Sequence, residues 1–277
     1  MASKILFPTD FSEPANKALR FVLPFAEKLE ASLVLMHAFT LPTPVMEAPF
    51  FAWEKELKRL EAQATPKLEL LKEVILVDHP SLPIEISAQM GFPVPSILSA
   101  AAEWEVDWIV MGTKGASGLK KVLLGSITAQ LIGRSPIPVL AIPENKLSPE
   151  IRRVVYATNY DPLELTALER VSRLAERLDA EVLVAHVFIG DNAPPMERWR
   201  AFEKLVKAKI EYPKLAFKFL PHYDFQTALR ALLSYTGAEI LAMCPHKRGL
   251  WERLFHVSKT KEVAYDAETP LLAIPEA

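Results

Sequence analysis

The sequence repeats itself once, at the scale of a whole domain. Three segments of the first half return in the same order in the second, the first of them more faintly: ILFPTDFSE at 5–13 as VVYATNYDP at 154–162, AEKLEASLVLMHAF at 26–39 as AERLDAEVLVAHVF at 175–188, and PVLAIPE at 138–144 as PLLAIPE at 270–276. Because the period is as long as a domain, the chain is predicted to be a duplication and not a solenoid. The repeat predicts domains over residues 1–146 and 150–277, with a polar join between them.

Each half alternates short apolar runs with segments of helical periodicity. In the first half the predicted strands are 4–9, 32–39, 84–89, 108–111 and 139–142, and the predicted helices start at 12 or occupy 53–71, 94–104 and 127–132. Pro66 is expected to interrupt the helix over 53–71. Strands rich in Val, Ile and Leu that alternate with helices indicate parallel sheets covered on both faces. The predicted fold class is α/β, with two tandem, doubly wound, parallel five-stranded sheets of Rossmann-like architecture.

Composition excludes several classes of protein. The chain has 277 residues and a net charge of −2, so no basic excess indicates a nucleic-acid partner. A single cysteine, Cys244, rules out an intramolecular disulfide framework and a cysteine-rich zinc site. No apolar run approaches the roughly 18 residues of a membrane span, and the start of the chain does not resemble a signal peptide. We therefore expect a cytoplasmic protein that binds neither nucleic acid nor membranes.

The glycines are unevenly placed. Four of the nine, Gly112, Gly115, Gly118 and Gly125, lie in one loop after the predicted strand 108–111. Glycine lets a ligand approach the backbone, and the helix that follows near Ser126 offers free N–H groups and a positive dipole end to an anion. Three lysines in the same loop add positive charge. The loop is predicted to bind phosphate, with a solvent-exposed turn as the alternative; it is neither a P-loop nor a dinucleotide fingerprint.

These motifs resemble a known family. The pattern G-x2-G-x9-G-S over 112–126 is similar to the nucleotide signature of ATP-binding universal stress proteins, as are P-T-D at 8–10 and His37 late in the second predicted strand. The resemblance covers the whole chain as a tandem pair and is strongest in the first domain. Lys114 stands where many members of that family have His, a departure that should not abolish binding.

The resemblance implies that the first domain holds ATP or another adenine nucleotide, with Mg²⁺ or Mn²⁺ shared among its phosphates. The sequence itself has no His or carboxylate at i, i+4 in a metalloprotease pattern, so a metal site built by protein side chains is not expected. Asp10 is implied to contact the ribose or the adenine edge, and the backbone at Ala38 to contact the adenine. The glycine loop and the start of the next helix are implied to hold the ribose and phosphates. The full set of implied binding positions is Pro8, Thr9, Asp10, Ala38, Met111, Gly112, Lys114, Gly115, Gly125, Ser126, Ile127 and Thr128.

The second half departs from this pattern. Asn159 aligns with Asp10, Cys244 takes the place of Gly112, and His256-Val257 stands for Gly125-Ser126. Larger side chains at these places would crowd a triphosphate, so the second domain is predicted to be a degenerate copy. Two alternatives stay open: a different anion held by the basic loop around 246–256, and a weakened nucleotide site at Asn159.

Three functions remain open on the sequence. A module that holds ATP and acts through conformation or partners is favoured, because the loop offers no obvious Gln, Glu or Arg finger for hydrolysis. A slow Mg-dependent ATPase and a scaffold without nucleotide are the alternatives. The short apolar strands 139–142 and 271–274 are predicted to pair within the chain as an internal pseudo-dimer, and a homodimer of chains is a further expectation.

Two histidines and the cysteine are interpreted as structural. His37 and His186 occupy matching places in apolar strands, and we predict core histidines with a satisfied ring nitrogen. Cys244 is predicted to be buried at a strand end and unreactive.

Overall fold

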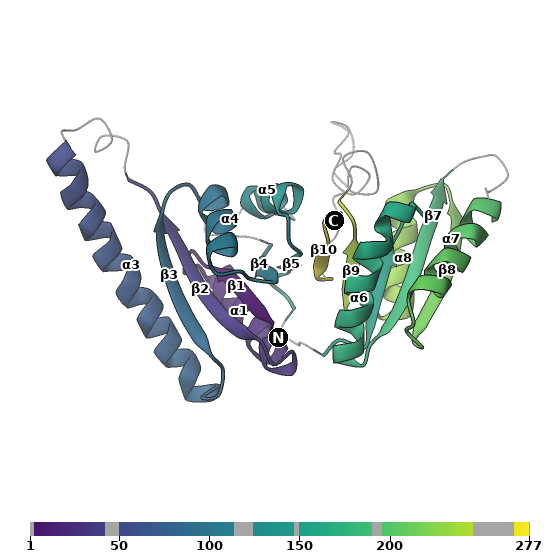
Figure 1. Ribbon diagram of the computed structural model, residues 1–277, viewed down its shortest axis with the longest axis horizontal. Helices are drawn as coiled ribbons and strands as arrows, with labels where there is room; N and C mark the ends of the chain where they lie inside the picture. Colours follow the sequence, from purple (N-terminus) through teal and green to yellow (C-terminus); the bar gives the residue numbers. More distant parts are fainter. Residues whose placement is uncertain are drawn as a thin grey trace. The chain divides into compact units, whose positions relative to one another are not determined.

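The chain forms two compact units, Met1–Ser135 and Pro136–Ala277. The computed structural model, drawn in Figure 1, describes residues 3–41, 50–113, 124–146, 150–189, 196–245 and 269–276. The predictions for Lys114, Gly115 and the segment 246–268 lie outside the described residues. Within the described residues, no helix combines the length and the apolar character needed to cross a membrane.

The first unit is built on four parallel strands. They are β1 (Lys4–Pro8), β2 (Ser32–Phe39), β3 (Ile84–Met90) and β4 (Trp108–Gly112). Their spatial order is β3-β2-β1-β4, so the chain steps outward twice and then returns past β1. The central strand β1 is buried through Ile5, Leu6 and Phe7. In such a sheet, ligands bind beyond the carboxyl ends of the strands, where the order reverses.

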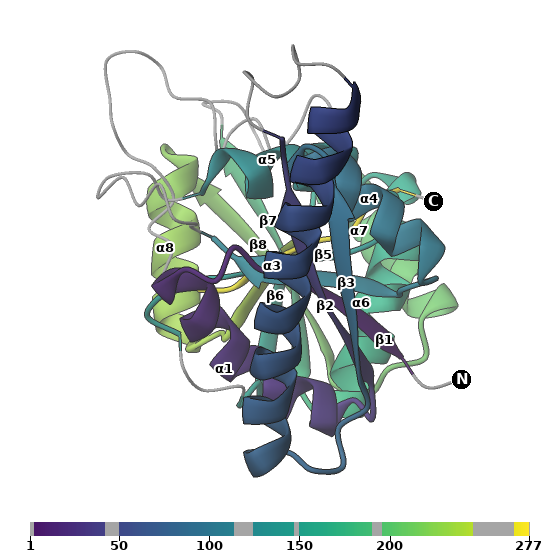
Figure 2. The same cartoon turned by 90° about the vertical axis from the view of Figure 1, so that its left-hand side faces the viewer.

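In the described part of this unit, the helices that connect or follow these strands are α1 (Glu13–Lys28), α3 (Phe50–Asp78), α4 (Pro93–Glu103) and α5 (Ser126–Arg134). Right-handed crossovers place α1 and α3 on one face of the sheet and α4 and α5 on the other. The contacts agree, because α3 packs on β2 and β3 whereas α4 packs on α5 as well as on the sheet (Figure 2).

The helix α3 differs from its prediction. It runs through Pro66 without ending there and extends to Asp78. A proline inside a helix removes a hydrogen bond and strains the preceding turn. In α3 the buried positions Ala64, Leu68 and Ile75 recur at helical spacing on both sides of that proline. Burial of this face against the sheet offsets the local cost, which is why the helix continues.

The described residues of the second unit form six strands. They are β5 (Val139–Ile142), β6 (Arg153–Ala157), β7 (Glu181–Ile189), β8 (Leu215–His222), β9 (Ile240–Met243) and β10 (Leu271–Ala273), in the spatial order β5-β10-β9-β6-β7-β8. Within the described residues, β9 pairs in parallel with β10 and β6, and β7 pairs in parallel with β6 and β8. The pairing of β10 with β5 is antiparallel, with Leu272 opposite Leu140. The predicted α/β class is confirmed, and this one pairing makes the sheet mixed. The pairing predicted between the two short apolar strands is present.

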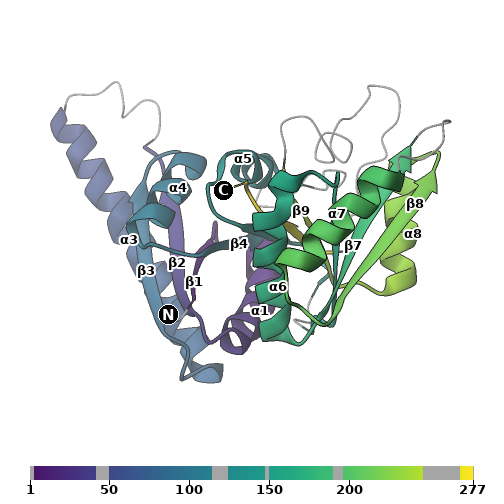
Figure 3. The same cartoon turned by 45° about the vertical axis from the view of Figure 1, so that its right-hand side comes forward.

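The strand β5 therefore lies in the second compact unit, although the repeat assigns residues up to 146 to the first domain. The hydrogen-bonded pairing of β5 with β10 explains this placement, because β10 belongs to the C-terminal half of the chain. The helices of the second unit are α6 (Leu165–Leu178), preceded by the 3₁₀ turn η1 (Pro162–Glu164), then α7 (Met196–Lys209) and α8 (Phe225–Thr236). Figure 3 shows α6 and α7 on the near side of β7 and β8, with α8 behind.

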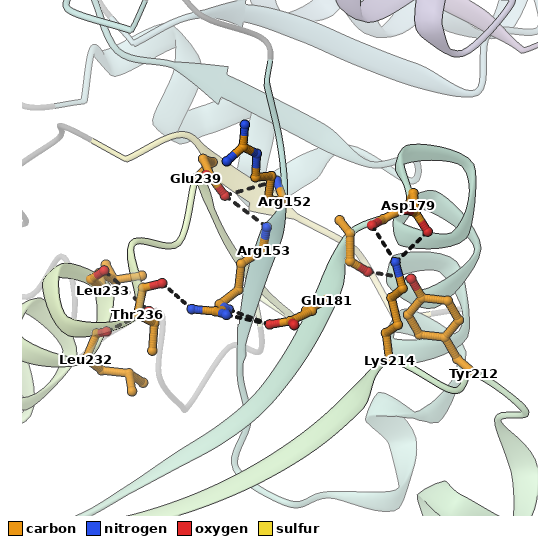
Figure 4. Close-up of polar contacts among 11 residues, drawn as sticks. Arg152, Arg153, Asp179, Glu181, Tyr212, Lys214, Leu232, Leu233, Thr236 and Glu239 are labelled. Atoms are coloured by element: carbon orange, nitrogen blue, oxygen red, sulfur yellow. Dashed lines mark hydrogen bonds and ion pairs between the residues drawn. The ribbon is translucent and has the colours of Figure 1, made fainter.

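Polar side chains close the amino-terminal edge of the second sheet (Figure 4). Glu239, just before β9, accepts the backbone N–H groups of Arg152 and Arg153 at 3.1 and 2.9 Å. The Arg153 guanidinium donates to Glu181 at the start of β7, at 2.8 Å from Nε, and to the Thr236 carbonyl. This edge is occupied by contacts within the chain, so the carboxyl edge is where a ligand site is expected.

Candidate functional site

A cavity of about 310 Å³ opens at the carboxyl edge of the sheet in the first unit. It is lined by Pro8, Thr9, Asp10, Ala15, Ala38, Pro93, Ile97, Met111, Gly112, Gly125, Ser126, Ile127 and Thr128. The ends of β1, β2 and β4 supply one part of the lining, and the first turns of α1, α4 and α5 supply the rest. Every predicted binding position within the described residues lines this cavity, while Lys114 and Gly115 lie outside those residues.

The turn after β1 holds Asp10 at the rim. The Thr9 N–H donates to the Met36 carbonyl at 2.8 Å, and the Thr9 hydroxyl oxygen accepts from the Phe11 N–H at 3.0 Å. Asp10 Oδ1 accepts from the Ser12 N–H at 3.0 Å. Phe11 has a φ of 60°, in the left-handed region that non-glycine residues rarely adopt. The turn is thus fixed by its own side chains, and Asp10 remains exposed.

His37 locks this turn from the neighbouring strand. Its Nδ1 lies 2.7 Å from the Thr9 carbonyl oxygen, so Nδ1 carries the proton and donates it. The imidazole also packs on the Phe11 ring, with centroids 4.6 Å apart. The predicted satisfied ring nitrogen is confirmed, whereas the prediction of a core position is wrong for His37, whose ring is half-buried near the end of β2.

The second unit contains the same turn. The Thr158 N–H donates to the Ala185 carbonyl at 2.9 Å, and the Thr158 hydroxyl oxygen accepts from the Tyr160 N–H at 2.8 Å. His186 Nδ1 lies 2.6 Å from the Thr158 carbonyl oxygen, and Tyr160 has a φ of 49°. The duplication seen in the sequence therefore extends to individual hydrogen bonds.

The start of α5 faces the cavity without a capping side chain. Gly125 is the N-cap residue, and its N–H donates to the Thr113 carbonyl at 2.6 Å. The N–H groups of Ser126, Ile127 and Thr128 belong to the first turn, where helix geometry supplies no acceptor. Because the helix dipole adds positive potential there, an anion is the ligand that this turn favours.

Thr128 has a second task. Its buried hydroxyl donates to the Gly112 carbonyl at 3.1 Å and so ties α5 to the end of β4. Because this hydroxyl donates to the backbone, Thr128 contributes to the cavity through its position in the first turn of α5.

Three lining residues were not predicted from the sequence: Ala15, Pro93 and Ile97. Pro93 begins α4, whose N-cap Phe92 makes no side-chain capping bond. The turn at 91–93 could have indicated that Pro93 lies at the site, because a helix that follows a parallel strand begins at the carboxyl edge of the sheet. Among the described lining residues, Asp10 carries the one charge. The described residues contain no cluster of three His, Cys, Asp or Glu side chains able to hold a metal ion.

Comparisons with known proteins agree with this architecture. The universal stress protein family matches residues 1–143. Universal stress protein MJ0577 of Methanocaldococcus jannaschii is 33% identical over 156 residues, which cover 51% of this chain and 95% of that protein. A universal stress protein of Mycolicibacterium smegmatis is 22% identical over 293 residues, covering 98% of this chain and 96% of that one. A crystal structure of a universal stress protein from Archaeoglobus fulgidus has a TM-score of 0.70 at 19% identity, covering 100% of this chain and 97% of that one, and shows the same fold.

Proposed function

The chain belongs to the universal stress protein family, and from that premise we propose that its N-terminal unit binds an adenine nucleotide in the cavity at the ends of β1, β2 and β4. We propose ATP as the ligand, with Mg²⁺ or Mn²⁺ carried on its phosphates. The chain then acts through its nucleotide-bound conformation or a protein partner, not through rapid catalysis.

The observation that supports this proposal is the convergence of two kinds of recognition in one cavity. Asp10 and the backbone at Ala38 offer the carboxylate and amide groups that suit a ribose and an adenine. The uncapped first turn of α5 offers N–H groups and positive potential to phosphate. The volume of about 310 Å³ is at the lower end of the range for small-molecule sites.

A metal ion fits this arrangement as a companion of the nucleotide. The described residues contain no group of three side chains that would hold it alone. Phosphate oxygens would therefore supply most of its ligands, with the Ser126 hydroxyl within the same lining. The ion would neutralise the phosphates beside the helix terminus.

Titration calorimetry with Mg-ATP tests the proposal. Asp10→Ala and Gly115→Val should each weaken binding by at least about tenfold, which corresponds to about 1.4 kcal/mol. Gly133→Ala is the matched control, because an added Cβ at Gly133 meets nothing within 4 Å and this position is not part of the lining. No binding by the wild-type chain, or equal affinity in all variants, would contradict the proposal.

Single-turnover hydrolysis of labelled ATP separates binding from catalysis. We expect a rate close to that of free Mg-ATP. A faster rate that Ser126→Ala abolishes would instead identify a slow ATPase, the alternative left open by the sequence.

A further inference from the structure

The two copies of the turn correspond residue by residue, and the correspondence extends into the cavity. The matching pairs are Thr9 and Thr158, Asp10 and Asn159, Phe11 and Tyr160, Ser12 and Asp161, and then Ala15 and Glu164. Ser12 and Asp161 are both N-cap residues whose side chains accept a backbone N–H, so the alignment holds at the level of structure. Ala15 lines the cavity of the first unit. The second unit therefore has a glutamate where the first has a methyl group.

Glu164 is buried and turned towards the strand end. It is 1% exposed, although it lies at the end of η1 where the chain enters α6. Its Oε1 accepts the Asn159 N–H at 3.0 Å. Burial of a carboxylate is costly unless hydrogen bonds offset the lost hydration. The carboxylate thus occupies the inner side of the turn, next to the residue that corresponds to Asp10.

The neighbouring strand brings a second side chain that is larger than its counterpart to the same place. The register of β1 with β4 pairs Leu6 with Ile109, and three residues further on it sets Thr9 opposite Gly112. The register of β6 with β9 pairs Ala157 with Met243, and one residue further on it sets Thr158 opposite Cys244. Gly112 lines the first cavity, whereas Cys244 is 2% exposed.

Burial and nearby carboxylates change the pKa values of the groups around Glu164. Burial first, and then the carboxylates of Glu164 and Asp161, raise the pKa of the Cys244 thiol to about 12. Burial and the Glu164 carboxylate also raise the pKa of the fully buried Tyr156 phenol well above its usual value. The prediction that Cys244 is buried is confirmed, and such a thiol is expected to be inert.

We propose that Glu164 is the internal occupant of the C-terminal counterpart of the first cavity and closes that cavity to ligands. Its carboxylate takes the space that Ala15 leaves open in the first unit and satisfies a backbone N–H at the strand end. Removal of this side chain reopens the cavity and exposes Cys244 at its wall. The proposal concerns the second unit alone, so it does not depend on what the first unit binds.

Labelling of Cys244 with a small thiol reagent measures the opening directly, because the chain has one cysteine. Glu164→Gln keeps the size of the side chain and removes its charge, whereas Glu164→Ala removes both. The change of charge affects the thiol in both variants, so their difference reports access. We expect Glu164→Ala to be labelled about tenfold or more faster than Glu164→Gln under native conditions.

Leu168→Ala is the control for loss of stability, because Leu168 is a fully buried residue of the same helix α6 and is not part of the turn. Its labelling should stay near that of the wild type. Equal labelling of Glu164→Ala and Glu164→Gln, or equally fast labelling of Leu168→Ala, would overturn the proposal. If Glu164→Ala does not fold, Glu164→Asp provides the same test, since it keeps the charge and shortens the side chain. It should be labelled faster than the wild type, whose side chain at this position carries the same charge, and an equal or slower rate would overturn the proposal.

Discussion

His37 and His186 make the same hydrogen bond in the two units, but His186 is more deeply buried. Replacing each by alanine therefore removes the same bond from two environments. His37 is half-buried, donates to the Thr9 carbonyl and packs on one ring, that of Phe11. A hydrogen bond contributes about 1 kcal/mol and one such ring contact about 1 kcal/mol. We therefore expect His37→Ala to lower the free energy of unfolding by about 2 kcal/mol.

The loss at His186 should be larger. This ring is 5% exposed and lies among three aromatic rings, those of Tyr160, Trp199 and Phe219. Its removal leaves a cavity among them and deprives the carbonyl of the fully buried Thr158 of a donor. A buried carbonyl without its donor costs about 1–3 kcal/mol, and the cavity adds to this. The expected loss is about 4 kcal/mol.

Urea unfolding followed by circular dichroism and tryptophan fluorescence measures both losses. The two units are analysed as separate transitions where the two signals do not coincide. His79→Ala is the control, because the His79 ring pairs with the Glu27 carboxylate near the surface and such pairs contribute about 1 kcal/mol or less. If His37→Ala lowers the free energy of unfolding as much as His186→Ala or more, burial of the histidine does not determine how much its hydrogen bond and ring contacts stabilise the turn.

Three other outcomes follow from the structure. Ala15→Glu places in the first cavity the side chain that the second unit already has, so calorimetry should show nucleotide affinity reduced by about tenfold or more, and unchanged affinity would show that Ala15 does not border the ligand. Gly91→Ala should destabilise the first unit by about 1–3 kcal/mol in urea, because Gly91 has a φ of 145° and an added Cβ would lie 2.5 Å from Ser96 Oγ. Gly133→Ala should instead stabilise it by about 0.5–1 kcal/mol, since this helical position has open space around it, and a loss of stability there would contradict the helix-propensity argument.

The fold was predictable wherever local pattern and burial agree. The strands β1 and β2 lie at the centre of the first sheet, and their burial is visible in the sequence as the unbroken apolar runs ILF and LVLM. Pro66 was misinterpreted because helix propensity is a local property, whereas the face that keeps α3 intact is buried by β2 and β3. The placement of β5 was also beyond local pattern, because it depends on pairing with β10, far along the chain.

The candidate site was predictable where backbone position alone determines it. Parallel strands end at one edge, so residues that follow β1, β2 and β4 meet there whatever their side chains are. Ile97 and Ala15 escaped prediction because they reach the cavity by packing of helix surfaces, and neither residue type indicates a ligand. Glu164 could have been found from the repeat itself, by continuing the alignment of the two turns for a few residues.

The two copies of the turn separate what the fold requires from what a ligand requires. Threonine, histidine and an aromatic residue with positive φ occur in both units, with the same hydrogen bonds, so they are needed to end the first strand of each sheet in this way. Three of the differences fall at positions that line the cavity of the first unit: Asp10 against Asn159, Ala15 against Glu164, and Gly112 against Cys244. Each of these three changes removes a negative charge or adds volume in the second unit. The proposed function places ligand binding at this wall, and the proposal for Glu164 places its closure there in the second unit. The exchange of Ala15 and Glu164 is therefore the sharpest test of both proposals.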